Sequence, residues 1–295
     1  MINVTLKIWE IFKRPDFLDF IKHKRTIFIK PNLCSDYLPP ATTRLETIQA
    51  VIRNLRFSFP SLRLVLIESD QSTKTMEEKM HRLGWNSLLL FPQGVDECMN
   101  LTDTERLAVE WLDERSGIIN LPVIKTTDIP NVKFTAATKN LFGLIPDPRK
   151  AKYHKKIIQV LRSLKEYYRP SVYTIIDGKY CMDGPGSPLK GNTVEFPQFY
   201  IAGRNLDEVD TLVCQICGFD LASVRYLDPV TPTISKEDQK IFDEAVKSHF
   251  KFGNFAPSSF TVIRRVVFEV LPSDTDGMAL TRIRKILGRG RRSLG

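Results

Sequence analysis

The sequence predicts an α/β fold with a mainly parallel sheet flanked by helices. The first observation is a series of apolar, strand-like runs that end in a polar residue or a glycine turn, at residues 26–32, 63–70, 117–127, 171–178 and 198–205. The second is that segments with helical periodicity lie between most of these runs, which is the strand–helix–strand order of a parallel sheet. Because ligands of such sheets bind beyond the carboxyl ends of the strands, we expect a ligand cleft there.

Helix signals separate the strand-like runs. Residues 1–25 are expected to hold a short strand and an amphipathic stretch. The sequence from Thr43 to Glu46 has the form of a capping box, in which both side chains satisfy free backbone N–H groups at the start of a helix. Further helices are predicted over residues 74–83, 102–117, 150–168, 205–218 and 235–249.

Two segments are predicted to be loops. Residues 126–148 contain several prolines and Gly143, and long loops in compact domains are often functional. Extended to His154, this segment is interpreted as a lid that closes over a bound ligand. Residues 181–191 form the second, glycine-rich loop, and a last strand is expected over 259–270.

Size and composition are those of a globular protein. The chain has 295 residues, of which 42% are hydrophobic and 26% are charged. This length fits one large α/β domain or two modest ones, and we place one α/β domain at residues 1–258 and a C-terminal strand with a basic tail at 259–295. No apolar run approaches the roughly 18 residues of a membrane span, and the N-terminus lacks the pattern of a secretory signal. We therefore expect a cytoplasmic protein whose five cysteines are reduced.

The net charge of +9 is unevenly distributed. One basic cluster lies in the tail after residue 281, and a second surrounds His154, from Arg149 to Lys156. The first cluster keeps nucleic-acid binding open as an alternative. The second lies beside the candidate site, and we favour a small anionic ligand as the partner.

Polar side chains at the ends of the strand-like runs are the first site candidates: Lys30, Asn32, Glu68, Asp70, Lys125, Thr126, Asp177, Arg204 and Asn205. Lys30 and Lys125 each end an apolar run, where burial would lower the pKa of an ammonium group, and two lysines together favour a bound anion. The alternative is that both head groups reach water. Asp177 is the best placed carboxylate, and an Asx-turn is its alternative role.

The stretch from Lys139 to Gly143 is the most distinctive short sequence. Lys139 and Asn140 supply hydrogen-bond donors, and Gly143 allows a ligand to approach the backbone closely. An ordinary helix start capped by Asn140 is the alternative. His154 stands among lysines, whose charge favours the neutral ring that a general base needs, although it could equally be a solvated histidine.

Three further features have weaker signals. The turn containing Asp183, Gly184 and Gly186 could wrap a phosphate, although it is not a P-loop. Asp210 is a carboxylate in an apolar helix, where it would be expected to point toward a site. Cys214 and Cys217 have the spacing of a redox or metal pair, but they lie in the same apolar helix, so core packing is the better interpretation.

Several short stretches, taken in order, resemble the family called "domain of unknown function 362". They are Lys30–Asn32, Glu68–Ser69, Ile119–Pro122 with Lys125–Thr126, Lys139–Gly143, His154, Asp177–Gly178, Asp183–Gly184 with Gly186, and Asp210. The resemblance spans about residues 26–219. It implies an α/β fold with a lysine- and histidine-lined cleft, in a mainly bacterial and archaeal family without an assigned activity. It also implies a distant similarity to the N-terminal region of nickel-pincer lactate racemases.

The chain departs from the family pattern in two places. Members often have lysine, threonine and histidine where this chain has Lys125, Thr126 and Thr127, so a second site histidine is missing. Many members also carry a ferredoxin-like module with repeated CxxC motifs. This chain has no such module, which argues against an iron–sulfur role.

Residues and resemblance together favour an isomerase- or transferase-like enzyme that acts on a small anionic metabolite or cofactor precursor. The expected chemistry is proton transfer by lysine and histidine, or covalent lysine chemistry, with Lys125, Lys139, His154 and Asp177 as catalytic residues. The expected ligand-binding residues are Lys30, Asn32, Glu68, Thr126, Asn140, Gly143, Asp183, Gly184, Gly186 and Asp210. No metal ligands are expected and the cofactor is left open. The alternative is a non-enzymatic binding protein for a phosphate-bearing cofactor or nucleic acid.

Overall fold

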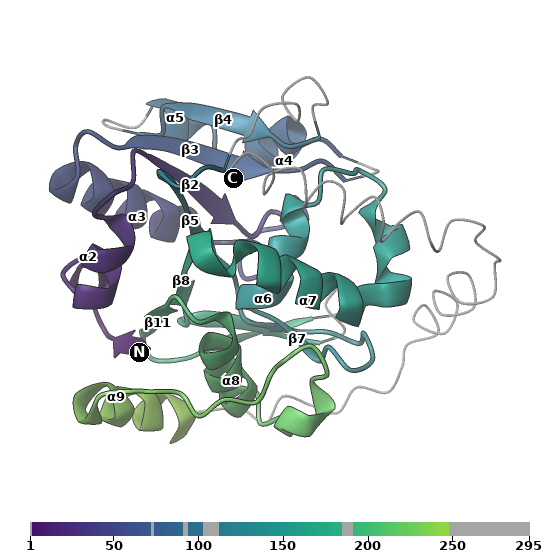
Figure 1. The fold of residues 1–295 in the computed structure, drawn as a ribbon. Helices are drawn as coiled ribbons and strands as arrows, with labels where there is room; N and C mark the ends of the chain where they lie inside the picture. The colour runs from purple at the N-terminus through teal and green to yellow at the C-terminus, as the bar shows by residue number, and fades with distance from the viewer. Residues whose placement is uncertain (1, 72–73, 91–93, 103–111, 185–190, 248–295) are drawn as a thin grey trace, which may run out of the picture.

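The computed structural model describes residues 2–71, 74–90, 94–102, 112–184 and 191–247. Its centre is a seven-stranded sheet with helices on both faces (Figure 1). In order across the sheet the strands are β1 (Asn3–Thr5), β11 (Tyr200–Gly203), β8 (Val172–Asp177), β5 (Ser116–Leu121), β2 (Thr26–Pro31), β3 (Arg63–Glu68) and β4 (Glu97–Asn100). The five strands from β8 to β4 are parallel, which confirms the predicted α/β class.

Alternation along the strands divides the core into two layers. Ile27 and Ile29 of β2 face one layer, whereas Phe28 between them faces the other. The first layer is covered by α1 (Ile8–Ile11), α2 (Pro15–Ile21), α3 (Leu45–Ser58), α4 (Met76–Arg82) and α5 (Ser87–Leu90). The second is covered by α6 (Ala137–Asn140), α7 (Ile157–Tyr168), α8 (Leu206–Ile216) and α9 (Lys236–Lys247).

A small second sheet and short 3₁₀ turns complete the layer around α6. The sheet has the order β10 (Asn192–Glu195), β9 (Tyr180–Asp183), β6 (Lys125–Thr126) and β7 (Phe134–Thr135). The turns are η2 (Leu141–Leu144), η3 (Lys150–Lys156), η4 (Arg169–Ser171) and η5 (Leu221–Ser223). None of the helices within the described ranges combines the length and apolar character needed to cross a bilayer.

The capping signals were predicted with mixed success. Helix α8 begins as expected after Asn205, whose side-chain oxygen accepts hydrogen bonds from the backbone of Asp207 and Glu208. The capping box predicted at Thr43 is wrong. Helix α3 begins after Arg44 without a side-chain cap, because the Thr43 hydroxyl instead donates to the Leu121 carbonyl at 2.6 Å.

The sequence predicted one long strand over residues 117–127, but the structure divides this run into two strands. Strand β5 ends at Leu121, and after the break at Pro122 the chain enters β6 of the small sheet. Proline cannot donate to a strand ladder, which is the physical reason for the break. Lys125 therefore comes from the second sheet, and its side chain contacts Asn32 in the segment after β2.

The last strand-like run differs from expectation in direction. Strand β11 pairs antiparallel with β8, because only the small strands β9 and β10 lie between them in the described chain and no crossover helix does. Its carboxyl end consequently lies at the opposite edge from the other strand ends. Arg204 is paired there with Asp19 at 3.1 Å, so it and Asn205 do not join the predicted site.

The segment 126–148 is not a long loop. It contains β7, α6 and η2, and residues such as Phe134, Leu141 and Leu144 are buried in the core. A lid made of the whole segment would have to pull these side chains into water, so the packing argues against that interpretation. The second expected loop, 181–191, begins inside β9.

Some expectations fall on residues outside the described ranges. These are most of the helix predicted over 102–117, Gly186, the strand predicted over 259–270 and the basic tail. The helices predicted over 74–83, 150–168 and 235–249 are present, the second of them beginning as the 3₁₀ turn η3.

Candidate functional site

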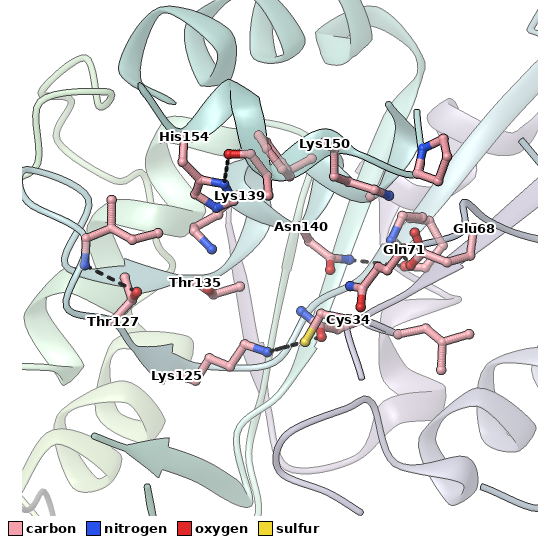
Figure 2. Close-up of a pocket in the computed structure, with 18 residues that line it drawn as sticks. Cys34, Glu68, Gln71, Lys125, Thr127, Thr135, Lys139, Asn140, Lys150 and His154 are labelled. Carbon is pink, nitrogen blue, oxygen red and sulfur yellow. Dashed lines mark hydrogen bonds and ion pairs between the residues drawn. The ribbon is translucent and has the colours of Figure 1, made fainter. Parts of the chain in front are cut away.

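A cavity of about 330 Å³ lies at the carboxyl ends of β2 and β3, under α6, η2 and η3 (Figure 2). Eight predicted site residues line it: Lys30, Asn32, Glu68, Lys125, Lys139, Asn140, Gly143 and His154. The lining also includes Leu33, Cys34, Gln71, Thr127, Ile129, Thr135, Phe142, Pro148, Lys150 and Ala151. The three lysines at positions 30, 125 and 139 thus meet at one cavity, although they come from different layers of the fold.

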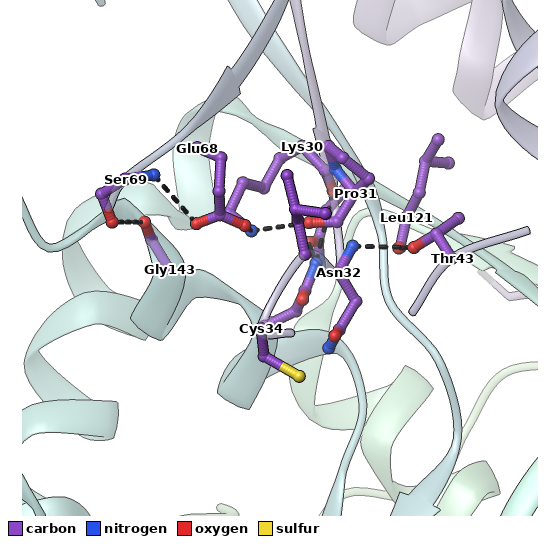
Figure 3. Close-up of polar contacts among 12 residues, drawn as sticks. Lys30, Pro31, Asn32, Cys34, Thr43, Glu68, Ser69, Leu121 and Gly143 are labelled. Carbon is purple, nitrogen blue, oxygen red and sulfur yellow. Dashed lines mark hydrogen bonds and ion pairs between the residues drawn. The ribbon is translucent and has the colours of Figure 1, made fainter. Parts of the chain in front are cut away.

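Lys30 and Glu68 form a buried ion pair at the floor of this cavity (Figure 3). The Lys30 ammonium lies 2.7 Å from a Glu68 carboxylate oxygen, and the other carboxylate oxygen accepts from the Ser69 backbone at 3.0 Å. Burial acts to raise the pKa of Glu68, but the charges of Lys30, Lys150 and Lys79 outweigh it and hold that pKa below its usual value. Glu68 is therefore a carboxylate.

Gly143 allows the chain to pass directly over this ion pair. A Cβ atom at Gly143 would lie 2.4 Å from a Glu68 carboxylate oxygen and 2.6 Å from the Lys30 ammonium nitrogen. The Gly143 carbonyl also accepts a hydrogen bond from the Ser69 hydroxyl. The sequence predicted that a ligand would approach the backbone closely at Gly143. In the structure the group that approaches Gly143 is the Lys30–Glu68 ion pair of the protein itself.

Lys150 is the residue that sequence reasoning missed and that changes the chemistry most. It starts η3, is only 7% exposed, and donates from its ammonium group to the Ser69 hydroxyl. Burial lowers the pKa of Lys150 to about 8, with Lys30 and Lys79 acting in the same direction and Glu68 opposing them. A pocket lysine with this pKa is partly neutral near pH 7 and can act as a base or nucleophile.

Lys125 is held by the protein on several sides. Its ammonium group donates to the side-chain oxygen of Asn32 at 3.3 Å, to the Ala41 carbonyl at 3.0 Å and to the Cys34 sulfur at 2.8 Å. These contacts tie β6 to the segment after β2. Lys125 is better placed to fix this wall and supply positive charge than to move a proton.

Two asparagines fix α6 on the sheet. The Asn140 amide donates to the Asn120 side-chain oxygen at 2.8 Å and to the Lys30 carbonyl at 3.3 Å. Asn120 in turn donates to the Ala137 carbonyl at 3.0 Å. Asn140 thus positions Lys139, its neighbour on the same short helix.

His154 lies at the opposite wall, on η3. Its Nδ1 is 3.0 Å from the Ala151 carbonyl, so this nitrogen carries the proton in the neutral ring and the lone pair lies on Nε2. The ring also packs against Phe142, with 5.0 Å between ring centroids. This geometry suits a proton acceptor at the cavity wall.

Asp177 does not line the cavity. Its carboxylate accepts hydrogen bonds from Thr47, Arg44, Gln198 and the backbone of Lys179. The bond to Lys179 two residues later is the Asx-turn named as its alternative role. A carboxylate saturated in this way holds β8, α3 and the next turn together, so the catalytic role predicted for it has no geometric support.

The remaining predicted ligand-binding residues also lie elsewhere. The Thr126 hydroxyl accepts from the Gly184 backbone at 2.7 Å and contacts the Asp183 carboxylate at 3.2 Å, which joins β6 to the end of β9. Asp210 is fully buried and accepts from the backbone of Ala137 and Thr138 at 2.7 and 3.0 Å. It points toward α6 but serves as an anchor for that helix. Gly186 lies outside the described residues.

The charge of the lining favours an anion. The described residues that line the cavity include four lysines but only one carboxylate, that of Glu68. The fully buried Lys79 lies behind the cavity, where its ammonium donates to the Leu33 carbonyl at 3.0 Å. Among the described residues no cluster of three or more histidine, cysteine or acidic side chains could hold a metal ion. Cys214 and Cys217 are buried in the core, which raises the pKa of both thiols.

Residues 27–215 match the family described as "Domain of unknown function (DUF362)". The chain belongs to this family. The DUF362 region runs from β2 to α8 and contains every residue that lines the cavity. No curated protein matches the chain, and no solved structure does. The family match confirms the resemblance seen in the ordered short stretches, and it brings no assigned activity with it.

Proposed function

We propose that the protein is an enzyme that acts on a small anionic metabolite or cofactor precursor in the cytoplasm, by lysine and histidine proton transfer or by covalent lysine chemistry. The observation that carries the proposal is Lys150. A buried lysine with a lowered pKa, in a cavity lined by further lysines, combines a reactive amine with sites for an anion. Cavities of this size hold small molecules, which favours a metabolite over a polymer.

The roles of the residues follow from their contacts. Lys139 and Lys30 supply positive charge toward the anion, and Lys125 fixes the wall that carries Asn32. Lys150 is the base or the nucleophile, in place of Asp177. His154 is the second proton-transfer group, with Nε2 as its acceptor atom. A distant relation to lactate racemases stays a prediction, and it is compatible with proton transfer next to a carboxylate.

Two assays test the proposal with small 2-oxo and 2-hydroxy carboxylates as probes. Proton transfer would appear by NMR in deuterated water as loss of the C2 hydrogen of a 2-hydroxy carboxylate, or of the C3 hydrogens of a 2-oxo carboxylate. Covalent chemistry would appear after borohydride reduction, as a mass increase on the peptide that contains Lys150, because the amine and the oxo group form an imine with loss of water. Lys150→Arg should abolish either signal, whereas Lys155→Arg, an exposed lysine on the same turn, should leave it unchanged.

The alternative function is a non-enzymatic carrier for a phosphate-bearing cofactor. The observation in its favour is that Lys30 and Lys125 donate to protein groups and so serve the architecture of the cavity. Titration calorimetry with inorganic phosphate and with the carboxylate probes, read together with the two assays above, separates the carrier from the enzyme. Binding without exchange and without a trapped adduct would favour the carrier and overturn the enzyme proposal.

A further inference from the structure

Cys34 is the one residue of the cavity lining that carries a thiol. It follows β2 closely, it is solvent-exposed, and its sulfur lies 2.8 Å from the Lys125 ammonium nitrogen (Figure 2). The Lys125 side chain is itself only 5% exposed. A buried ammonium group thus contacts the sulfur of an exposed residue in the cavity lining.

The charges around Cys34 favour the thiolate. Desolvation of the sulfur acts to raise the pKa of the thiol, but Lys125 outweighs it through its charge and its hydrogen bond. Lys139 also lowers this pKa and Glu68 opposes it, so the net result is a pKa below the usual value. The other thiols behave in the opposite way. Burial raises the pKa of Cys98 to about 11 and that of Cys214 to about 12.

A second observation next to this pair points to a ligand. Thr135 lies directly opposite Lys125 across β6 and β7, so both side chains are on the same face of the small sheet. Thr135 lines the cavity and is 97% buried, since only 3% of its surface is exposed. Its hydroxyl has no hydrogen-bond partner among the residues that the structure describes. A buried hydroxyl without a partner is costly, and an oxygen-bearing ligand beside Lys125 would satisfy it.

We propose that Cys34 is a covalent attachment site for small anionic carbon electrophiles that enter this cavity. The positive charge of the lysines attracts the carboxylate of such a ligand, and the Thr135 hydroxyl donates a hydrogen bond to it, which brings the electrophilic carbon toward the sulfur. With a haloacetate the sulfur electron pair forms the S–C bond, and the halide leaves with the electron pair of the broken C–halogen bond. The site shares the cavity with the proposed enzyme activity but not its chemistry, since Lys150 takes no part in the step.

Alkylation with two reagents of different charge tests the inference. The full chain is treated with iodoacetate, which is anionic, or with iodoacetamide, which is neutral, and each cysteine is followed by peptide mass spectrometry. We expect Cys34 to react at least about tenfold faster than Cys98, because Cys34 combines an exposed position with a lowered thiol pKa, whereas burial raises the pKa of Cys98. Relative to the same two rates for glutathione, Cys34 should also prefer iodoacetate by about tenfold, because the lysines concentrate anions.

Variants separate the contributions of the lysines. Lys139→Met should reduce the preference for iodoacetate, and Lys125→Met should shift the alkylation rate profile toward higher pH. Because Lys125 also holds Asn32 and Ala41, its variant is first checked by circular dichroism. The wild-type comparison needs no variant: equal rates at Cys34 and Cys98, or no preference for the anionic reagent, would overturn the inference. Borohydride trapping at Lys150 is scored separately, so failure of one proposal leaves the other standing.

Discussion

Lys30 and Glu68 join the ends of two neighbouring strands through an ion pair of 2.7 Å that is almost wholly removed from solvent. The Lys30 side chain is 1% exposed and that of Glu68 is 4% exposed. Removing both charges from water is costly, and the pair persists because further hydrogen bonds from Ser69 and to Pro31 complete its surroundings. The pair thereby fixes the floor of the cavity.

Glu68→Gln should destabilise the fold by about 3–5 kcal/mol, because the Lys30 ammonium would stay buried without its counter-charge. Urea denaturation at pH 7 measures this change in the free energy of unfolding. Glu97→Gln is the matched control. Glu97 of β4 pairs with the exposed Arg63, which lies on β3 together with Glu68. A surface pair of that kind contributes no more than about 1 kcal/mol. Equal losses in the two variants would contradict the structural role of the Lys30–Glu68 pair.

Gly143→Ala should destabilise the protein by about 1–3 kcal/mol, the usual cost of overpacking, because the added methyl group would overlap the ion pair. The measurement is a double-mutant cycle with Glu68→Ala, which shortens the side chain nearest to the new methyl group. The cost of Gly143→Ala should fall in the Glu68→Ala background. Strict additivity of the two changes would show that the strain lies elsewhere.

Lys150 should titrate near pH 8. An NMR titration of isotope-labelled lysine side chains would show one resonance with this midpoint, lost in Lys150→Arg and retained in Lys155→Arg. Because Glu68 acts to raise the pKa of Lys150, Glu68→Gln should move the midpoint to lower pH. A midpoint that rises in this variant would contradict the assigned electrostatics.

Asp210 should make stability fall as the pH rises from about 4 to about 6. Burial raises its pKa from 3.8 to about 6 in the folded protein, although the Thr138 and Ala137 donors act to lower it. The folded state therefore binds more protons than the unfolded state in this window, and a rise in pH favours unfolding. The difference in unfolding free energy between wild type and Asp210→Asn should change by about 3 kcal/mol across it. A constant difference between pH 4 and pH 7 would refute the shift.

The layered architecture could be predicted because each strand and helix leaves its own periodic signal. Strands β2, β3 and β8 and helices α3, α7 and α8 follow directly from apolar patterning. The direction of β11 could not be predicted in this way, because the apolar pattern of a strand is the same whichever direction the strand runs. The described residues between β8 and β11 hold only β9 and β10, and the missing crossover helix there was the available signal for an antiparallel pair.

The site residues at the ends of parallel strands could be predicted from the sequence. The site residues whose position depends on contacts between distant segments could not. Lys30 and Glu68 follow from the strand-end rule, and Lys139, Asn140 and Gly143 from their composition. Lys150 was seen only as part of a basic cluster, because its buried setting depends on a contact with Ser69, 81 positions away in sequence, and has no local signature. Cys34 had no signal either, since its contact with Lys125 spans 91 positions in sequence.

The anchoring of α6 by Asp210 has a consequence for how much of the chain the cavity requires. All of the described lining comes from residues 30–154, yet the carboxylate that holds α6 belongs to α8, more than fifty positions later. A truncated chain ending before α8 would retain every lining side chain and lose the group that orients Lys139 and Asn140. The smallest fragment able to bind a ligand in this cavity therefore extends at least through α8, and a domain excised for binding studies should be cut beyond Ile216.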